Sequence, residues 1–156
     1  MPTLDLKIPP PLVALLAASA MWGASRFDGS HGWAELWPAF RIGAALLIAT
    51  LGAGFDVAGI IAFRQAKTTL NPMKPHTSVA LVSHGIYRIT RNPMYVGLGL
   101  ILLAWAVYLA SDWALLGPLA FAAYITRFQI QPEERVLAAR FGNQFNRYQA
   151  SVRRWL

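Results

Sequence analysis

The stretch Ile42–Phe63, IGAALLIATLGAGFDVAGIIAF, decides the fold, because a single charged residue, Asp56, interrupts an otherwise apolar or small-residue run. A helix of about 20 such residues crosses the hydrocarbon core of a bilayer. Three further blocks contain no charged residue at all, and they lie at Ile8–Ser25, Asn92–Ser111 and Trp113–Thr126. The sequence therefore predicts about four transmembrane helices.

The composition supports the same fold class. The 156 residues are 56% hydrophobic and 13% charged, whereas a soluble domain averages about 25% charged residues. We predict an all-α, multispan membrane protein with one domain, 1–156, and a cytoplasmic amphipathic C-terminal helix. The fourth block is short, but Arg127 can extend its side chain to the interface. The absence of cysteine excludes disulfides, Cys-type zinc sites and thiol nucleophiles.

The basic residues gather on two segments that flank the apolar blocks. Arg64–Pro93 carries five basic residues and no acid, and Arg127–Leu156 carries six arginines against two glutamates. The positive-inside rule places both segments in the cytoplasm, and an even number of spans places the N-terminus there too. Anionic lipid headgroups explain the net charge of +7. We therefore expect a multi-pass membrane protein whose polar chemistry faces the cytoplasm, and no nucleic-acid partner.

The segment after the fourth block is predicted to be helical. Pro132 suits a helix start, with Glu133 and Glu134 in the first turn near the positive end of the helix dipole. Gly142 is expected to interrupt this helix. Beyond it, one apolar face of an amphipathic helix is predicted from the spacing of Phe145, Tyr148, Val152 and Trp155.

Three motifs in the second half of the chain carry a family resemblance. They are GIY at 85–87, RNPMY at 91–95 and EERVL at 133–137, followed by Phe141-Gly142 and Tyr148. With these motifs the chain resembles the isoprenylcysteine carboxyl methyltransferase-like integral membrane methyltransferases, which are similar in turn to phospholipid N-methyltransferases. The resemblance covers about 68–156, which would be the cofactor-binding part of the domain.

The resemblance implies an enzyme that binds S-adenosylmethionine in a cytoplasm-facing pocket and methylates a lipophilic or small hydrophobic acceptor: a carboxylate, an amine or a thiol. Carried over by position, the implied cofactor contacts are Val79, Ala80, Leu81, Val82, Tyr87, Asn92, Pro93, Met94, Tyr95 and Glu133. Gln129 stands where the prenylcysteine enzymes have a substrate-contacting arginine. This departure argues against prenylcysteine as the acceptor.

The residues suit S-adenosylmethionine on chemical grounds as well. Asn92 and Pro93 favour a helix start whose backbone N–H groups could hold the cofactor's carboxylate. Glu133 could pair with its ammonium, and Tyr87 or Tyr95 could contact adenine, ribose or sulfonium. Each feature also has a structural interpretation: a helix cap, an acid placed for the dipole, or tyrosines anchored at the membrane interface. The sequence contains no G-x-G-x-x-G motif, and this argues against a Rossmann methyltransferase.

Asp56 is a separate signal, because an acid inside a predicted span is costly unless it faces protein or water. It is a candidate catalytic residue that orients or deprotonates the acceptor, or a structural acid bonded to Arg127 or a neighbouring helix. The pair Gly97 and Gly99 is interpreted as helix packing. No metal site is expected from the three histidines. An NADPH-dependent reductase of the sterol-reductase type and a non-catalytic scaffold remain alternative functions.

Overall fold

The computed structural model describes residues 5–27, 38–66 and 80–156, and all regular structure in these ranges is helical. The elements are α1 (Pro10–Phe27), α2 (Pro38–Gln65), the 3-10 helix η2 (Gly85–Arg88), α3 (Pro93–Leu109), the 3-10 helix η3 (Trp113–Leu115), α4 (Leu116–Ile125), the π-helical η4 (Thr126–Ile130), α5 (Gln131–Phe141) and α6 (Asn143–Ser151).

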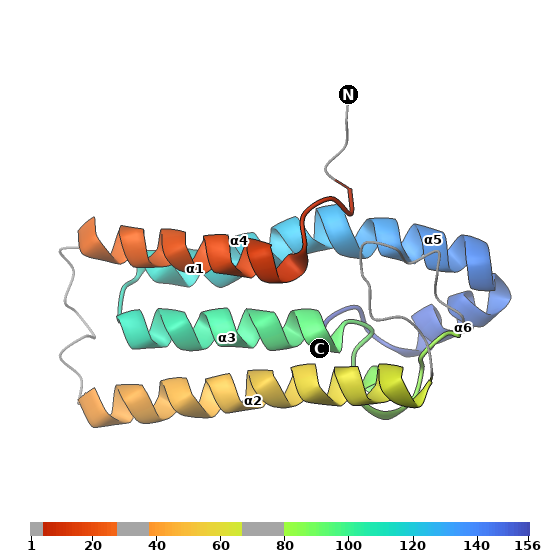
Figure 1. Ribbon diagram of the computed structural model, residues 1–156, viewed down its shortest axis with the longest axis horizontal. Helices are drawn as coiled ribbons and strands as arrows, with labels where there is room; N and C mark the ends of the chain where they lie inside the picture. The colour runs from red at the N-terminus through yellow and green to blue at the C-terminus, as the bar shows by residue number, and fades with distance from the viewer. Residues whose placement is uncertain (1–4, 28–37, 67–79) are drawn as a thin grey trace.

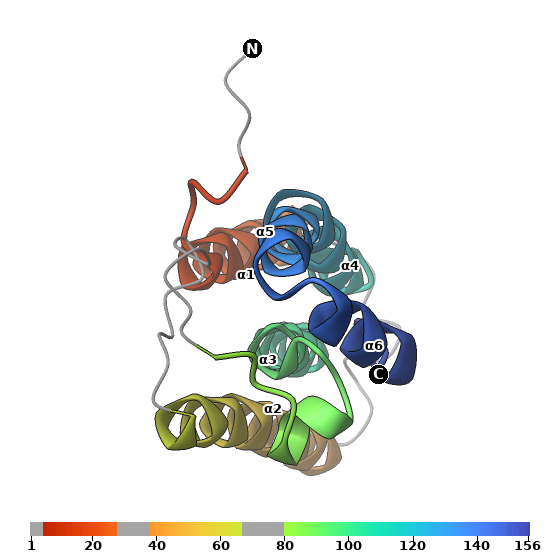
Figure 2. The same cartoon turned by 90° about the vertical axis from the view of Figure 1, so that its right-hand side faces the viewer.

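Helix α3 lies at the centre of the bundle (Figures 1 and 2). Helix α2 packs along one side of it, and α1 and α4 lie on the other side. The interior of the α1–α3–α4 layer is apolar, with Leu102, Phe121 and Ile125 almost fully buried. Helices α5 and α6 lie at one end of the bundle (Figure 1).

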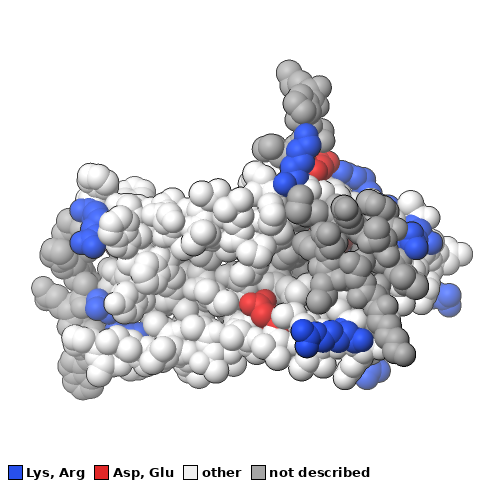
Figure 3. Space-filling view, viewed as in Figure 1, with Lys and Arg blue, Asp and Glu red and all other residues white. Residues whose placement is uncertain are grey.

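The surface of the bundle is apolar where a bilayer would contact it. In the described residues, α2 is long and apolar enough to cross a membrane, and α3 is a shorter apolar helix. Large apolar side chains of α1, α2 and α4 are exposed, among them Leu15, Leu46 and Leu119. On the face shown in Figure 3, lysine and arginine lie toward the two ends, with a wide band of mostly uncharged atoms between them. The count of four spans stays a prediction.

The expected helix start at Pro132 is found as a change of helix type and not as a free end: α5 begins at Gln131, with Pro132, Glu133 and Glu134 in its first turn. The helical backbone runs without a break from η3 through α4 and η4 into α5, so Glu133 and Glu134 do not lie at a free helix end. Proline has no N–H and its ring normally clashes with the preceding turn. The wider π-helical turn immediately before it provides the room, since the Gln131 N–H donates to the Thr126 carbonyl, five residues back.

The C-terminal helix is shorter than the apolar spacing predicts. Gly142 interrupts the helix as expected, with a positive φ of 49°, but α6 ends at Ser151 and Val152 is extended. Phe145 and Tyr148 pack with Tyr87 in one apolar cluster, whereas Trp155 packs against the α1–α3–α4 core. The four apolar residues therefore do not share one helical face.

Close packing of α2 on α3 depends on glycine. A Cβ atom at Gly52 would lie 2.8 Å from the Gly97 carbonyl oxygen, and one at Gly97 would lie 2.7 Å from the Gly52 carbonyl oxygen and collide with the Asp56 carboxylate. A Cβ at Gly99 would meet nothing within 4 Å. Helix packing thus accounts for Gly97, and the same interpretation of Gly99 is wrong.

We predict that Gly97→Ala destabilises the bundle by about 1–3 kcal/mol, the usual cost of overpacking a close contact. Gly99→Ala is the matched control on the same helix, and it should be neutral or slightly stabilising because alanine is the better helix former. Thermal melting of both variants in detergent measures the difference. Equal melting temperatures would contradict the observed α2–α3 contact.

Candidate functional site

An ion-pair network joins three distant segments at the end of the bundle. The Glu134 carboxylate on α5 accepts hydrogen bonds from Arg91 Nη2 at 2.7 Å, and from Arg154 Nη2 at 2.7 Å and Arg154 Nε at 3.1 Å. The side chains of Arg91 and Glu134 are only 9% and 13% exposed. Burial alone would raise the pKa of Glu134, but the two arginines outweigh it and lower the pKa below its ordinary value.

The RNPMY motif anchors the end of the chain. Arg91 Nη1 donates to the carbonyl oxygens of Gln149 and Val152, at 2.9 and 2.6 Å. Asn92 Nδ2 donates to the Arg154 carbonyl at 2.9 Å, and the Thr90 hydroxyl lies 3.2 Å from the same oxygen. Much of this motif therefore has a structural role, which the sequence did not reveal because its partners lie about 60 residues away.

Asn92 occupies the N-cap position of α3 as predicted, and Pro93 is the first helical residue. The side chain of Asn92 makes no capping hydrogen bond, because it is directed to Arg154 instead. The N–H groups of Tyr95 and Val96 already donate to the Asn92 carbonyl. Of the first-turn donors, the Met94 N–H is the one for which no backbone acceptor is found in the described part of the chain, so it is the donor we consider for an anion at this helix end.

Glu133 differs from Glu134 in its partners. Its Oε1 accepts a hydrogen bond of 2.6 Å from the Tyr95 hydroxyl, which joins α5 to the first turn of α3. Within the described residues no arginine, lysine or histidine forms an ion pair with it. Burial raises the pKa of Glu133 to about 8, against the lowering effect of the Tyr95 hydrogen bond. Glu133 as a whole is partly exposed, but its carboxyl group is enclosed and pairs with no cation among the described residues.

Tyr87 lies near this acid, on η2. Its ring packs edge-on against Phe63 of α2, with the centroids 5.5 Å apart, and its carbonyl accepts a 2.7 Å hydrogen bond from the Tyr148 hydroxyl. Burial raises the pKa of Tyr87, and the charges of Tyr148 and Glu133 raise it further. The structure therefore brings Tyr87, Tyr95 and Glu133 together from three elements.

Of the other residues that the resemblance implies as cofactor contacts, some pack with this group and others do not. Val82 is buried in the same apolar cluster as Tyr87, and Leu81 packs against that cluster. Ala80 is partly buried at the start of the same segment, whereas Val79 lies outside the described residues. Met94 faces α2, where a Cβ at Gly59 would lie 2.9 Å from its Cγ.

Asp56 and Gln129 make their contacts with residues outside the tyrosine–glutamate group. Asp56 projects from α2 onto Gly97 of α3, and α5 lies on a different side of α3 (Figures 1 and 2). Arg127 pairs with Asp5 at 3.6 Å, so the suggested bond from Asp56 to Arg127 is not formed. Gln129 is 1% exposed; its Nε2 donates to the Ile8 carbonyl at 3.3 Å, and its Oε1 is buried with no donor in the described chain.

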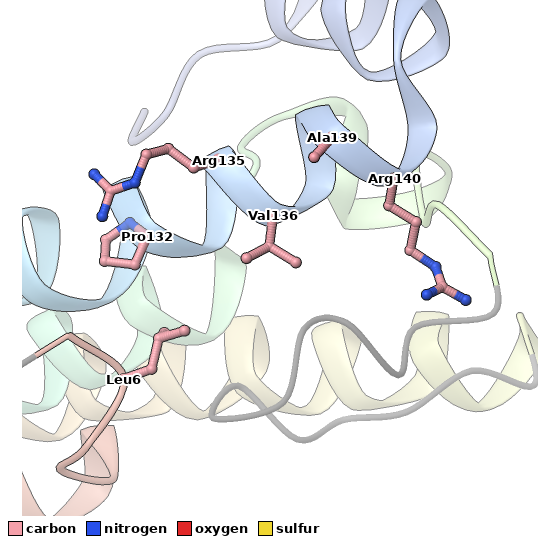
Figure 4. A pocket seen from close by; sticks show the side chains of 6 residues that line it. All are labelled: Leu6, Pro132, Arg135, Val136, Ala139 and Arg140. Carbon is pink, nitrogen blue, oxygen red and sulfur yellow. The ribbon is translucent and has the colours of Figure 1, made fainter.

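A pocket of about 540 Å³ opens beside α5, on the side next to the residues that precede α1 (Figure 4). Its lining is apolar except for two arginines, and consists of Leu6, Pro132, Arg135, Val136, Ala139 and Arg140. Glu133 and the tyrosines are not part of this lining. The pocket is therefore a neighbour of the candidate site and not the site itself.

Comparison with known proteins identifies related sequences. The phospholipid methyltransferase family matches residues 40–144. An uncharacterized protein of Haemophilus influenzae is 48% identical over 63 residues, which are 40% of this chain and all of that protein. No solved structure matches the chain.

The two neighbouring glutamates should respond oppositely to removal of their charge. We predict that Glu134→Gln destabilises the protein by about 2–3 kcal/mol, because it leaves two arginines without their anion. Glu133→Gln should be neutral or stabilising near pH 8, because it removes an enclosed charge that no described cation pairs with. Thermal melting in detergent of the two variants, without cofactor, measures both effects.

The pH dependence follows from the raised pKa of Glu133. Its ordinary value is 4.5 and its folded value about 8, so the folded state binds the proton more tightly and stability falls as pH rises between these values. Glu133→Gln should flatten this part of the curve. The same slope in the variant and the wild type would show that Glu133 is not the enclosed acid.

Proposed function

We propose, from the premise that the chain belongs to the phospholipid methyltransferase family, that it is an S-adenosylmethionine-dependent membrane methyltransferase. The acceptor is a lipid or small hydrophobic nucleophile that reaches the site from the bilayer. The single observation that carries the proposal is the enclosed Glu133 carboxylate, which is held by Tyr95 and has no cation among the described residues.

Glu133 suits the ammonium of the cofactor for an electrostatic reason. An enclosed carboxylate with a raised pKa is stabilised by any cation that enters, and a charge-assisted hydrogen bond to an ammonium is stronger than a neutral one. Glu134 cannot take this role, because Arg91 and Arg154 already hold it. Of these two adjacent acids, Glu133 would bind the ligand and Glu134 would hold the three segments together.

The surrounding residues would hold the rest of the cofactor. Val82 and Leu81 provide an apolar wall, Tyr87 and Tyr95 provide aromatic rings, and the Met94 N–H provides a donor for the carboxylate. When bound, S-adenosylmethionine supplies an activated methyl group on a sulfonium. The protein then has to align the acceptor with that methyl and keep water away.

The proposed topology places this site at the cytoplasmic face. Arg64, Arg88 and Arg91 lie at or beyond the same ends of α2 and α3 as the site residues. Cytoplasmic flanks of membrane helices carry an excess of such residues. With four spans, the cofactor would enter from the cytoplasm and the acceptor from the side.

Gln129 and Asp56 are the proposed acceptor residues. The hydrogen bond of Gln129 Nε2 to the Ile8 carbonyl fixes the amide, so its Oε1 is a buried atom that can only accept. An acceptor with an N–H or O–H group would satisfy it, whereas a carboxylate would not. Asp56 lies one turn before Gly59, which contacts Met94. It can take the proton that an amine or thiol loses as it is methylated.

The cofactor assignment predicts that Glu133→Gln weakens S-adenosylmethionine binding by about 1.5–3 kcal/mol, the contribution of a hydrogen bond to a charged group. Binding is measured by titration calorimetry on the detergent-purified protein. Glu134→Gln is the matched control, and the loss of affinity in its folded fraction should be much smaller than in Glu133→Gln. Binding of NADPH in place of S-adenosylmethionine would favour the reductase, and binding of neither would favour a scaffold.

The acceptor assignment predicts methyl transfer to amine or thiol acceptors over prenylcysteine. A radiolabelled methyl-transfer assay with phosphatidylethanolamine, small hydrophobic thiols and prenylcysteine measures the preference. Asp56→Asn should lower the turnover of an amine or thiol and leave cofactor binding unchanged. Rapid methylation of prenylcysteine would overturn the role of Gln129, and full activity of Asp56→Asn would remove Asp56 from the reaction.

A further inference from the structure

Residues 5–8, immediately before α1, bind to the α4–α5 helix at the point where proline interrupts its hydrogen bonds. Pro132 has no N–H, so the Phe128 carbonyl, four residues earlier, lacks its usual α-helical partner. The Leu6 N–H donates to this carbonyl at 3.0 Å. A residue far away in sequence thus replaces the donor that proline removes.

The backbone of Leu6 has an uncommon conformation at this contact. Its φ is 56°, in the left-handed region that a branched apolar residue rarely adopts. Such a conformation persists only where neighbouring contacts enforce it. Here the contacts on either side of Leu6 are those of Asp5 and Ile8.

Asp5 and Ile8 each bind a side chain of the helix. Asp5 Oδ2 lies 2.9 Å from Arg135 Nη2, and its Oδ1 lies 3.6 Å from Arg127 Nη1. The two arginines lie on opposite sides of Pro132 in sequence. The Ile8 carbonyl accepts the hydrogen bond of the buried Gln129. Together with the Leu6 hydrogen bond, four contacts from this short segment therefore span the interrupted turn from residue 127 to residue 135.

We propose that Asp5, Leu6 and Ile8 form a clamp that positions Glu133 in the candidate site. The clamp fixes the turn that ends at Pro132, and Glu133 is the next residue. This inference rests on the proposed function only where it concerns cofactor affinity. Its structural part, the placement of Glu133 against Tyr95, does not depend on the ligand.

The position of Glu133 can be observed through its own titration. Tyr95 of α3, Tyr87 of η2 and Glu134 of its own helix face this carboxyl. If the clamp loosens, α5 can move away from α3, water can reach the carboxyl, and its pKa falls toward the ordinary value. A general loss of stability would lower the folded fraction without moving this midpoint.

The test uses the full-length protein in detergent, with Asp5→Asn to remove the charge and Asp5→Glu to restore it. Lys7→Gln is the matched control, because it removes a charge from the same segment where no ion pair with the described acids is formed. Arg127→Gln, which loses the longer Asp5 contact, is a milder variant should Asp5→Asn fold poorly. Carbon-13 NMR of glutamate-labelled protein, assigned with Glu133→Gln, follows the titration without cofactor.

We expect the Glu133 midpoint to fall in Asp5→Asn and Arg127→Gln, and to stay near that of the wild type in Asp5→Glu and Lys7→Gln. Calorimetry at pH 9, where Glu133 is ionised in every variant, should show about two- to fivefold weaker S-adenosylmethionine binding in Asp5→Asn, the scale of an exposed ion pair. An unchanged midpoint and affinity in Asp5→Asn would overturn the clamp. Wild-type protein that binds no S-adenosylmethionine would overturn the proposed function, while a shifted midpoint would still support the clamp.

Discussion

The Glu134 carboxylate binds Arg91 and Arg154 at the same time, and the rest of the site depends on this interaction. It joins α5 to the segment before α3 and to the end of the chain, since Arg91 and Arg154 lie 43 and 20 residues from Glu134 in sequence. A mostly buried carboxylate is tolerated because two guanidinium groups neutralise it. Since both arginines are taken, the adjacent Glu133 is left with a neutral tyrosine as its partner. The ion pairs of Glu134 thus leave Glu133 without an arginine, and this is the property proposed to let Glu133 bind the cofactor's ammonium.

The bundle provides a rigid base for this arrangement. Glycines at the α2–α3 contact allow the two helix backbones to approach closely, so that Asp56 packs directly on α3. Glu133 and Glu134 belong to α5, the second half of the continuous α4–α5 helix, which lies at one end of the bundle. Its π-helical turn and Pro132 form a weak point in the backbone hydrogen bonding, which the Leu6 N–H compensates. The interrupted turn and the Leu6 hydrogen bond that compensates for it therefore lie immediately before Glu133, the acid proposed to bind the cofactor.

The sequence was a sufficient guide to most of the helices. Apolar blocks marked α1 to α4, Asn92 and Pro93 marked the start of α3, and Gly142 marked the break between α5 and α6. Long-range contacts could not be predicted, because nothing local indicates them. The partner of Arg91, the extended backbone at Val152 and the continuation of the helix through Pro132 all depend on residues that tertiary structure brings together. The family resemblance singled out Glu133 and Tyr95, but their hydrogen bond became apparent only in three dimensions.

The central claim is that Glu133 is an enclosed acid that receives the cofactor's ammonium, and the release of protons on binding tests it most directly. With a pKa of about 8, most of this carboxyl is protonated at pH 7 and must lose its proton when a cation binds. Titration calorimetry of S-adenosylmethionine in buffers of different ionisation enthalpy counts the protons released. The account predicts release of a large fraction of one proton by the wild type at pH 7, where the cofactor's ammonium is already charged, and none by Glu133→Gln at the same pH. Tight binding without proton release at pH 7, or the same release by Glu133→Gln, would contradict it.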